Sequence, residues 1–228
     1  MKDLIKKILK EETKEEYIFE IPNLGFIPNT DLGSDKGVTE AWDELLRLLN
    51  GKPFIFDNNL SLYKGDITSL GNLRSVNGDF ELQDVNITSL GNLESVGGNF
   101  NLININITSL GNLQSVGGYL KPEETPITSL GNLQSVGDFL DLFDARITSL
   151  GNLQSVGDYL DLSRTDITSL GNLKSVGGYL SLYKTNVTSL GNLEFVGESL
   201  ILKETPISKK YSEEEIRQMV KVVGRVIL

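Results

Sequence analysis

Ile67-Thr68-Ser69-Leu70-Gly71-Asn72-Leu73 is the stretch that decides the fold, because it returns every 20 residues. Further copies begin at residues 87, 107, 127, 147 and 167, and a last copy begins at Val187. A fixed period of this length is typical of a solenoid, in which each repeat forms one coil. We number each repeat from residue 61, 81, 101 and so on, so that this stretch fills repeat positions 7 to 13.

The apolar residues of each repeat predict one strand per coil. In the repeat from Asp141 they are Leu142, Ile147, Leu150, Leu153, Val156 and Leu160. Leu140 and Leu142 alternate with polar residues, as in a strand with one buried face. The three-residue spacing from Leu150 to Val156 favours a tight or extended return path on the opposite side. A single coil buries too little apolar surface to offset its loss of chain entropy, so the coils must stack.

Repeat position 17 is glycine in every repeat except the first, where it is Asn77. Glycine and asparagine are the residues that tolerate positive φ. We therefore expect a left-handed corner at position 17, just before the strand. Position 18 accepts Gly78, Asp138 and Glu198, which predicts no such restriction there.

The segment Leu180-Ser-Leu182-Tyr-Lys-Thr185-Asn-Val187 resembles the leucine-rich repeat, with Thr where that family usually has the Asn of its ladder. The pattern Leu-Gly-Asn-Leu-x-Ser-Val-Gly-Gly-x-Leu-x-Leu is also similar to the repeats of receptor L domains. The resemblance covers residues 60–207. It implies a parallel β solenoid that binds ligands, usually other proteins. It supplies no catalytic residue to transfer.

Residues 1–50 are predicted to form an N-terminal helical cap region. Residues 2–16 favour a first helix, residues 17–21 a strand and residues 22–38 a loop. Thr39 is the expected N-cap of a helix over residues 40–50 that ends at Gly51. Trp42 is expected in the core of this cap rather than in a binding site.

Residues 51–208 are predicted to form a solenoid of about eight coils, and residues 209–228 a C-terminal capping helix. Ser212 and Glu215 have the spacing of a capping box, and residues 226–228 are expected to extend the helix. Inside the solenoid, Pro122 stands where the other coils have a buried Leu. Because proline donates no hydrogen bond, we expect a kink or an unpaired carbonyl on the neighbouring strand.

Repeat positions 1, 3 and 19 are expected to point outward from the strand. Neighbouring strands lie about 4.8 Å apart, so the aromatic residues at position 19 should form a continuous ladder. Aromatic residues with a charged rim are typical of protein interfaces, which predicts a protein partner, including one with a basic patch. The candidate partner-binding residues are Tyr119, Phe139, Tyr159, Tyr179, Asp141, Asp161, Phe143 and Tyr183.

Other interpretations of the same repeats remain open. The aromatic residues can stack only on one another, as aromatic residues in strands often do. A glycan could stack on the ladder, as in an adhesion protein, and a virion-associated structural role is a further alternative. The Thr and Ser columns at positions 8 and 9 resemble an ice-binding face, although hydroxyls in turns often bond the backbone. An enzyme is disfavoured, because an open face offers no burial to raise the pKa of Asp141 or Asp161.

The composition narrows the function classes. The formal net charge is −10, which argues against nucleic-acid binding. The chain has no Cys and no His, so we expect no catalytic residue, no metal site and no cofactor. No apolar run is long enough for a membrane span, and the lysines near Met1 argue against a signal peptide. We expect a cytoplasmic or virus-associated protein, including one from a phage.

Overall fold

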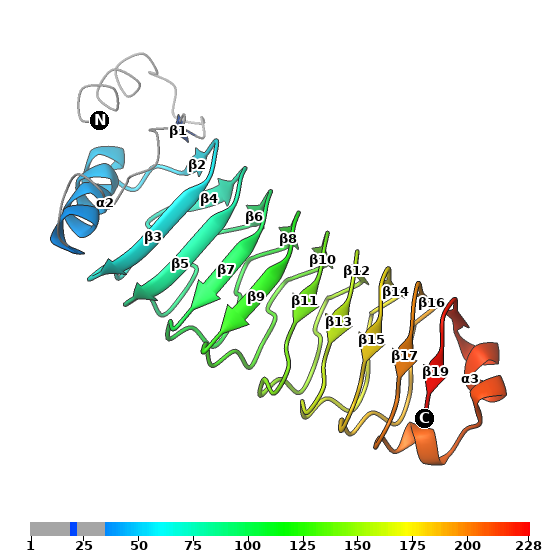
Figure 1. Cartoon of the computed structure of the whole chain (residues 1–228). Coiled ribbons are helices and arrows are strands. Elements are labelled where there is room, and N and C mark those ends of the chain that lie inside the picture. Colours follow the sequence, from blue (N-terminus) through cyan, green and yellow to red (C-terminus); the bar gives the residue numbers. More distant parts are fainter. Residues whose placement is uncertain (1–18, 22–34) are drawn as a thin grey trace.

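The chain forms a parallel β solenoid in which each 20-residue coil contributes two strands (Figure 1). The computed structural model describes residues 19–21 and 35–228. The prediction of one strand per coil is wrong, because repeat positions 15 and 16 pair in a second sheet. The reason is that the return path is extended: Ser155 faces outward and Val156 is buried, which is the alternation of a short strand.

Among the described residues, ten strands form one parallel sheet and nine form the other. Sheet A runs in the order β1 (Phe19–Ile21), β2 (Phe54–Phe56), β4 (Leu73–Val76), β6 (Ser95–Val96), β8 (Ser115–Val116), β10 (Ser135–Val136), β12 (Ser155–Val156), β14 (Ser175–Val176), β16 (Phe195–Val196) and β18 (Lys221–Val222). Sheet B runs from β3 (Leu60–Gly65) through β5 (Phe80–Val85), β7 (Phe100–Ile103), β9 (Leu120–Glu123), β11 (Leu140–Asp141), β13 (Leu160–Asp161), β15 (Leu180–Ser181) and β17 (Leu200–Ile201) to β19 (Val226–Ile227).

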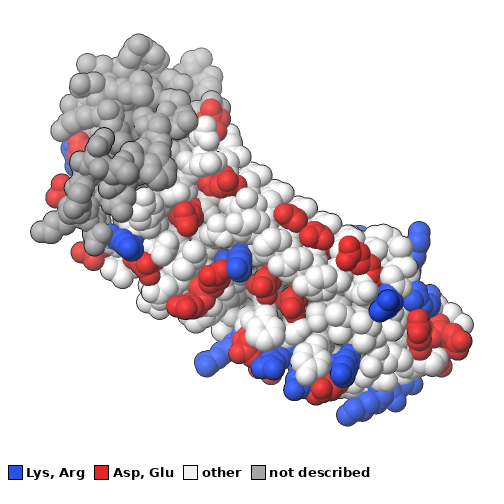
Figure 2. Space-filling model, viewed as in Figure 1, with Lys and Arg blue, Asp and Glu red and all other residues white. Residues whose placement is uncertain are grey.

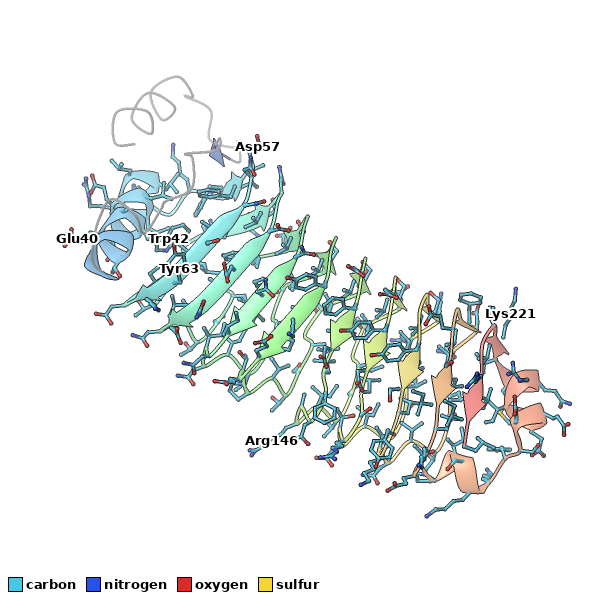
Figure 3. The ribbon with its side chains drawn as sticks, viewed as in Figure 1. Glu40, Trp42, Asp57, Tyr63, Arg146 and Lys221 are labelled. Carbon is cyan, nitrogen blue, oxygen red and sulfur yellow. The ribbon has the colours of Figure 1, made fainter. Side chains whose placement is uncertain are left out.

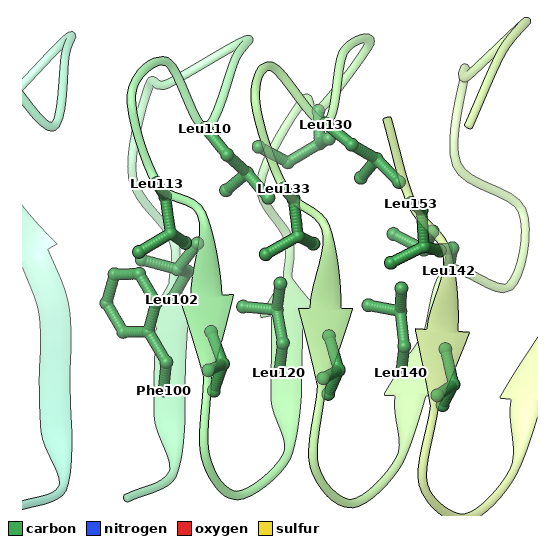
Figure 4. Packing of buried hydrophobic residues seen from close by; sticks show 14 of the residues in the cluster. Phe100, Leu102, Leu110, Leu113, Leu120, Leu130, Leu133, Leu140, Leu142 and Leu153 are labelled. Carbon is green, nitrogen blue, oxygen red and sulfur yellow. The ribbon is translucent and has the colours of Figure 1, made fainter. Parts of the chain in front are cut away.

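The strands pair in register, so each repeat position forms a column along the solenoid. Leu140 of β11 pairs with Leu160 of β13, and Val136 of β10 pairs with Val156 of β12. The two sheets enclose columns of buried aliphatic side chains (Figure 4). Leu133, Leu140 and Leu153, for example, are fully buried. Every side chain at a given position therefore meets its counterparts from the coils before and after it.

The left-handed corner of the coil lies at repeat position 11, in the heptapeptide, rather than at position 17. The glycines from Gly71 to Gly191 have φ between 56° and 60° there. Glycine at position 17 has another cause: a Cβ at Gly117 would collide with the carbonyl oxygen of Gly97 in the preceding coil. The prediction of a corner at position 17 is therefore wrong, and close backbone approach between coils explains the glycine.

A second left-handed residue stands at repeat position 4, near the end of the sheet B strand in the first coils and shortly after it in the later ones. It is never glycine, and its φ lies between 48° and 61° from Lys64 to Glu204. In the C-terminal coils the next residue is a buried Thr that closes this corner. The hydroxyl of Thr165 donates to the carbonyl of Leu162 at 2.7 Å. Each such Thr thus stabilises a turn within its own coil.

Helix α2 (Asp35–Leu49) packs at the N-terminal end of the solenoid, beside β3. Trp42 is buried, and its indole N–H donates to the carbonyl of Ser69 at 2.8 Å. Its predicted place in the core of the cap is confirmed. The helix ends before Asn50 and Gly51, which both have positive φ, as expected. Its start was wrongly predicted, since Thr39 lies inside the helix. The helix predicted over residues 2–16 lies outside the described residues.

The C-terminal cap combines a short helix with one further strand for each sheet. The 3₁₀ helix η1 (Ile207–Lys209) leads into α3 (Glu213–Met219), whose predicted capping box between Ser212 and Glu215 is present. The helix was predicted to continue, but β18 and β19 follow it and extend the two sheets. Arg217 of α3 donates to the carbonyls of Val222 and Gly224 at 2.8 and 2.7 Å. The cap therefore satisfies backbone groups of the last turn of the chain.

Pro122 removes a hydrogen bond from sheet B. In the neighbouring strand pair the N–H of Leu142 donates to the carbonyl of Asp161 at 2.9 Å. Pro122 has no N–H, so the carbonyl of Asp141 lacks that donor, and β9 pairs with β11 only through Leu120 and Leu140. The expected loss of a ladder hydrogen bond at Pro122 thus accompanies a pairing of only one residue pair, although sheet B continues across it. Pro122 is also only half-buried, whereas Leu142, at the same position of the next coil, is 2% exposed.

Candidate functional site

Repeat position 19 lies at the entry to each strand of sheet B and carries two kinds of residue in succession. In the first coils Asn59, Asp79 and Asn99 form a row that we call the Asx row. Each side-chain Oδ1 accepts the backbone N–H of position 19 in the next coil, at 2.7 to 3.1 Å. The last acceptor serves Tyr119, where the aromatic residues begin. The column thus changes from amide and carboxylate groups to rings halfway along the solenoid.

The aromatic ladder consists of Tyr119, Phe139, Tyr159 and Tyr179. Its rings stack in parallel, with centroids 4.6, 4.6 and 4.8 Å apart and interplanar angles of 8°, 4° and 1°. The stacking predicted from the repeat period is confirmed. All four side chains are half-buried. Because neighbouring rings cover each other's faces, the ladder presents mainly ring edges and hydroxyl groups to solvent.

The residue at position 18 depends on the residue at position 19 of the preceding coil. A Cβ at Gly98 would collide with Oδ1 of Asp79, and a Cβ at Gly118 would collide with Oδ1 of Asn99. Where position 19 of the preceding coil is Tyr119 or Phe139 instead, position 18 is an aspartate, Asp138 or Asp158. The expectation that position 18 is unrestricted is therefore wrong beside the Asx row and holds beside the first rungs of the aromatic ladder.

Asp141 and Asp161 lie next to the ladder at position 1, on neighbouring strands in direct register. The Oδ1 atom of Asp141 accepts the N–H of Phe143 at 3.0 Å, and that of Asp161 accepts the N–H of Ser163 at 2.8 Å. In the part of the chain that the structure describes, neither carboxylate forms an ion pair. The ammonium of Lys121 pairs with Glu123 instead, and this hydrogen bond is the main cause of its raised pKa.

Two tyrosines of the ladder, Tyr159 and Tyr179, are influenced by these carboxylates. Burial raises the pKa of the Tyr179 phenol to about 12, and the charge of Asp161 adds to the shift. Burial also raises the pKa of Tyr159, with Asp141 as the second cause. The hydroxyl of Tyr119 accepts a hydrogen bond from the side-chain amide of Asn101 at 3.1 Å. At neutral pH Tyr159 and Tyr179 therefore present protonated phenols beside acidic groups.

Phe143 and Tyr183 are separate from the ladder and from each other. They stand at position 3, two residues beyond Asp141 and Ser181 respectively, and the buried Ser163 occupies position 3 of the repeat between them. Phe143 is 52% exposed, and the guanidinium of Arg164 lies 5.4 Å from its ring centroid. The ammonium of Lys184 lies 5.1 Å from the ring centroid of Tyr183. Both rings thus already carry a cation of the same chain.

Basic side chains are concentrated along one edge of this face, where acidic side chains lie among them. Figure 2 shows Asp and Glu side chains across the face that Figure 1 presents, and Lys and Arg side chains gathered along the lower edge of the C-terminal half. The stick view places Arg146 at that lower edge (Figure 3). The candidate partner-binding residues therefore form one acidic aromatic patch, the ladder with Asp141 and Asp161, and a neighbouring row in which Phe143 and Tyr183 contact basic side chains.

The outer face of sheet A carries an open groove of about 650 Å³. Its floor consists of Ser at position 15, Val at position 16 and Gly at position 17 of successive coils, and it ends at Phe195. The glycines are explained by the close approach of neighbouring coils. The groove is therefore a consequence of stacking, and it holds no charged side chain.

The Thr and Ser columns differ in their contacts. Each Ser at position 9, from Ser69 to Ser189, accepts the backbone N–H of the glycine two residues later at 2.9 to 3.1 Å. The Thr side chains at position 8 are exposed in every coil from Thr68 to Thr188. The serines thus hold the left-handed corner at position 11, as the backbone-bonding interpretation of these hydroxyls predicts.

Two features of the site were not predicted from the sequence. Asn101 contacts a ring 18 residues later, which no local pattern indicates. Asp138 and Asp158 at position 18 add two more carboxylates beside the ladder, and the change from glycine to aspartate there could have indicated them.

No family model, no curated protein and no solved structure matches the chain. Among the described helices, none is long and apolar enough to cross a membrane.

Proposed function

We propose that this chain is a non-catalytic binding module, related to leucine-rich-repeat proteins, that binds a protein partner through the outer face of sheet B. One observation carries the proposal: four rings stack in register beside carboxylates that have no ion pair among the described residues. A preformed row of rings loses little side-chain entropy when a partner covers it. Rigid aromatic side chains are enriched at protein interfaces for this reason.

The repeat architecture supports the proposed relationship to leucine-rich repeats. Leucine occupies position 2 of every repeat except that of Pro122, and position 20 is leucine or, at Phe80 and Phe100, phenylalanine. The residue that closes the corner is Thr165, Thr185 or Thr205 where that family usually has Asn. A parallel solenoid with variable outward residues and constant inward residues suits recognition of extended surfaces.

A glycan partner is less well supported by the geometry. Sugars stack on exposed ring faces, whereas the inner faces of the ladder cover each other at 4.6 to 4.8 Å. An enzymatic role is also less well supported, because one carboxylate oxygen of Asp141 and one of Asp161 each accept a hydrogen bond from a backbone N–H.

The proposal is tested by a pull-down from the cell of origin, with the full chain and a Tyr159→Ala/Tyr179→Ala variant as baits. A protein retained by the full chain and lost by the variant is the expected result. Retention of the same proteins by both baits would contradict the proposal. Soluble glycans that bind the full chain with the same loss would replace the protein partner by a sugar.

A further inference from the structure

The aromatic ladder ends at Tyr179. Position 19 of the following coil is Ser199, and Arg225 follows in the cap, because Leu200 pairs with Val226. One face of the Tyr179 ring stacks on Tyr159 at 4.8 Å. Among the described residues no ring or cation lies over its other face, on the side of Ser199. The next ring of the ladder would lie over this face, parallel to Tyr179 and at the same spacing as the other rings, but the chain has Ser199 there.

Other rings of the C-terminal half differ in this respect. The chain itself places a cation over each of four rings outside the ladder. These pairs are Arg164 with Phe143, Lys184 with Tyr183, Lys210 with Tyr211 and Lys221 with Phe195. None of the described lysines or arginines lies over a ladder ring in this way. A cation from another molecule can therefore stack on the ladder, as an arginine and lysines of this chain stack on the other four rings.

Unpaired carboxylates surround the end of the ladder. Asp161 is the charged group that most affects Tyr179, followed among the acids by Asp141 and Asp158. Glu198 adjoins Ser199 and is exposed. Within the described part of the chain none of these four side chains forms an ion pair, since the ion pairs there involve other acids. The local field therefore attracts a positive group to the face of Tyr179 on the side of Ser199.

We propose that the face of Tyr179 above Ser199 is a subsite for a guanidinium group, supplied by an arginine side chain of the protein partner. The inference rests on the proposed function of the same face. A guanidinium is planar, so it can continue the stack of rings, and its N–H groups can donate to a neighbouring carboxylate such as Asp161. An ammonium group supplies the charge without the plane, which makes lysine the weaker ligand.

The probe is the peptide acetyl-Gly-Arg-Gly-amide, added to the full chain labelled with ¹³C in its tyrosine rings. Nuclear magnetic resonance should show saturable shifts of the Tyr179 ring signals. The matching peptide with citrulline, which has the shape of arginine without its charge, should bind about fivefold or more weakly. The lysine peptide should also bind more weakly than the arginine peptide. Shifts that are equal for all three peptides, or absent from Tyr179, would overturn the proposal.

Two variants test the subsite itself. Ser199→Phe supplies the missing rung within the chain, so it should abolish the response of Tyr179 to the arginine peptide. Asp161→Asn keeps the ladder and removes one charge, so it should weaken binding by about threefold. Thr188→Val is the matched control on another face and should change nothing. Full binding by Ser199→Phe and by Asp161→Asn would contradict the subsite.

The two proposals fail in different ways. If the arginine peptide does not bind at Tyr179 but ladder variants lose the protein partner, the subsite is wrong and the binding face stands. If the peptide binds at Tyr179 and ladder variants keep the partner, the binding face is wrong.

Discussion

Asp79 and Gly98 are coupled across two neighbouring coils. The Oδ1 atom of Asp79 accepts the backbone N–H of Asn99 at 2.7 Å, and it would collide with a Cβ at Gly98. The side chain that satisfies one backbone group thus adds to the close backbone of Gly78 and Asp79 in restricting this position to glycine. The same relationship holds between Asn99 and Gly118, and it ends where Tyr119 begins the aromatic ladder.

Gly98→Ala should therefore lower the free energy of unfolding by about 1–3 kcal/mol, the usual cost of overpacking. Asp138→Ala is the matched control at the same repeat position and should change it by less than about 0.5 kcal/mol. Asp79→Ala combined with Gly98→Ala should cost less than the sum of the two single changes, because the collision with the carboxylate is gone and only the close backbone of Gly78 and Asp79 remains. Urea unfolding measures all of these values, and strict additivity would contradict the coupling.

Pro122→Leu should stabilise the solenoid by about 1 kcal/mol or more. Leucine can fill a position that is buried in the other coils, and its N–H can donate to the carbonyl of Asp141. The urea midpoint of the variant is the measurement. An unchanged or lower midpoint would show that the neighbouring strands have adapted to proline.

Arg217→Met should cost about 1 kcal/mol, because it removes the donors of the carbonyls of Val222 and Gly224 in the C-terminal cap. Arg225→Met is the control, since the side chain of Arg225 is exposed and makes no hydrogen bond among the described residues. Thermal unfolding should separate the two variants. Equal melting temperatures would contradict the role of Arg217.

The pKa of Tyr179 predicts a loss of stability in alkali. Its phenol has a pKa of about 12 in the folded chain, against about 10 in an unfolded one. The unfolded state therefore loses its proton first, so the stabilisation is complete below pH 10 and disappears as the pH rises toward 12. Two pKa units correspond to about 2.7 kcal/mol, and because the side chain is only half-buried, solvent screening should make the loss smaller than this. Urea unfolding between pH 9 and 12 should show it, and Tyr179→Phe should reduce this slope. An equal slope in both proteins would contradict the assignment.

The repeat period predicts much of this structure, because every coil repeats the same apolar positions. The stack of Tyr119, Phe139, Tyr159 and Tyr179 follows directly from that period and from the spacing of paired strands. The left-handed residues at position 4 could not be predicted in this way, since Lys64, Asp84 and their counterparts are not glycine. Their conformation belongs to the corner of the coil, which Thr165, Thr185 and Thr205 close in the C-terminal coils.

Contacts between coils account for the other differences. Glycine at position 17 reflects a carbonyl group 20 residues earlier, and a local pattern does not distinguish that cause from a positive φ. The strands β18 and β19 were predicted as helix because Ile216, Met219 and Val223 have helical spacing. Met219 and Val223 are instead 46% and 63% exposed, while the segment pairs with the last strands of both sheets.

The most direct test of the binding face compares dissociation constants for the purified partner. Tyr179→Ala is the cleaner variant, because Tyr179 stacks on one ring and Tyr159 on two, and each stacked pair contributes about 0.5–1.5 kcal/mol. Tyr179→Ala should weaken binding by about 2 kcal/mol or more, beyond its effect on unfolding measured in parallel. Thr148→Val with Thr168→Val on the other face should leave binding unchanged. Loss of the partner by the threonine variant, with full binding by Tyr179→Ala, would contradict the account.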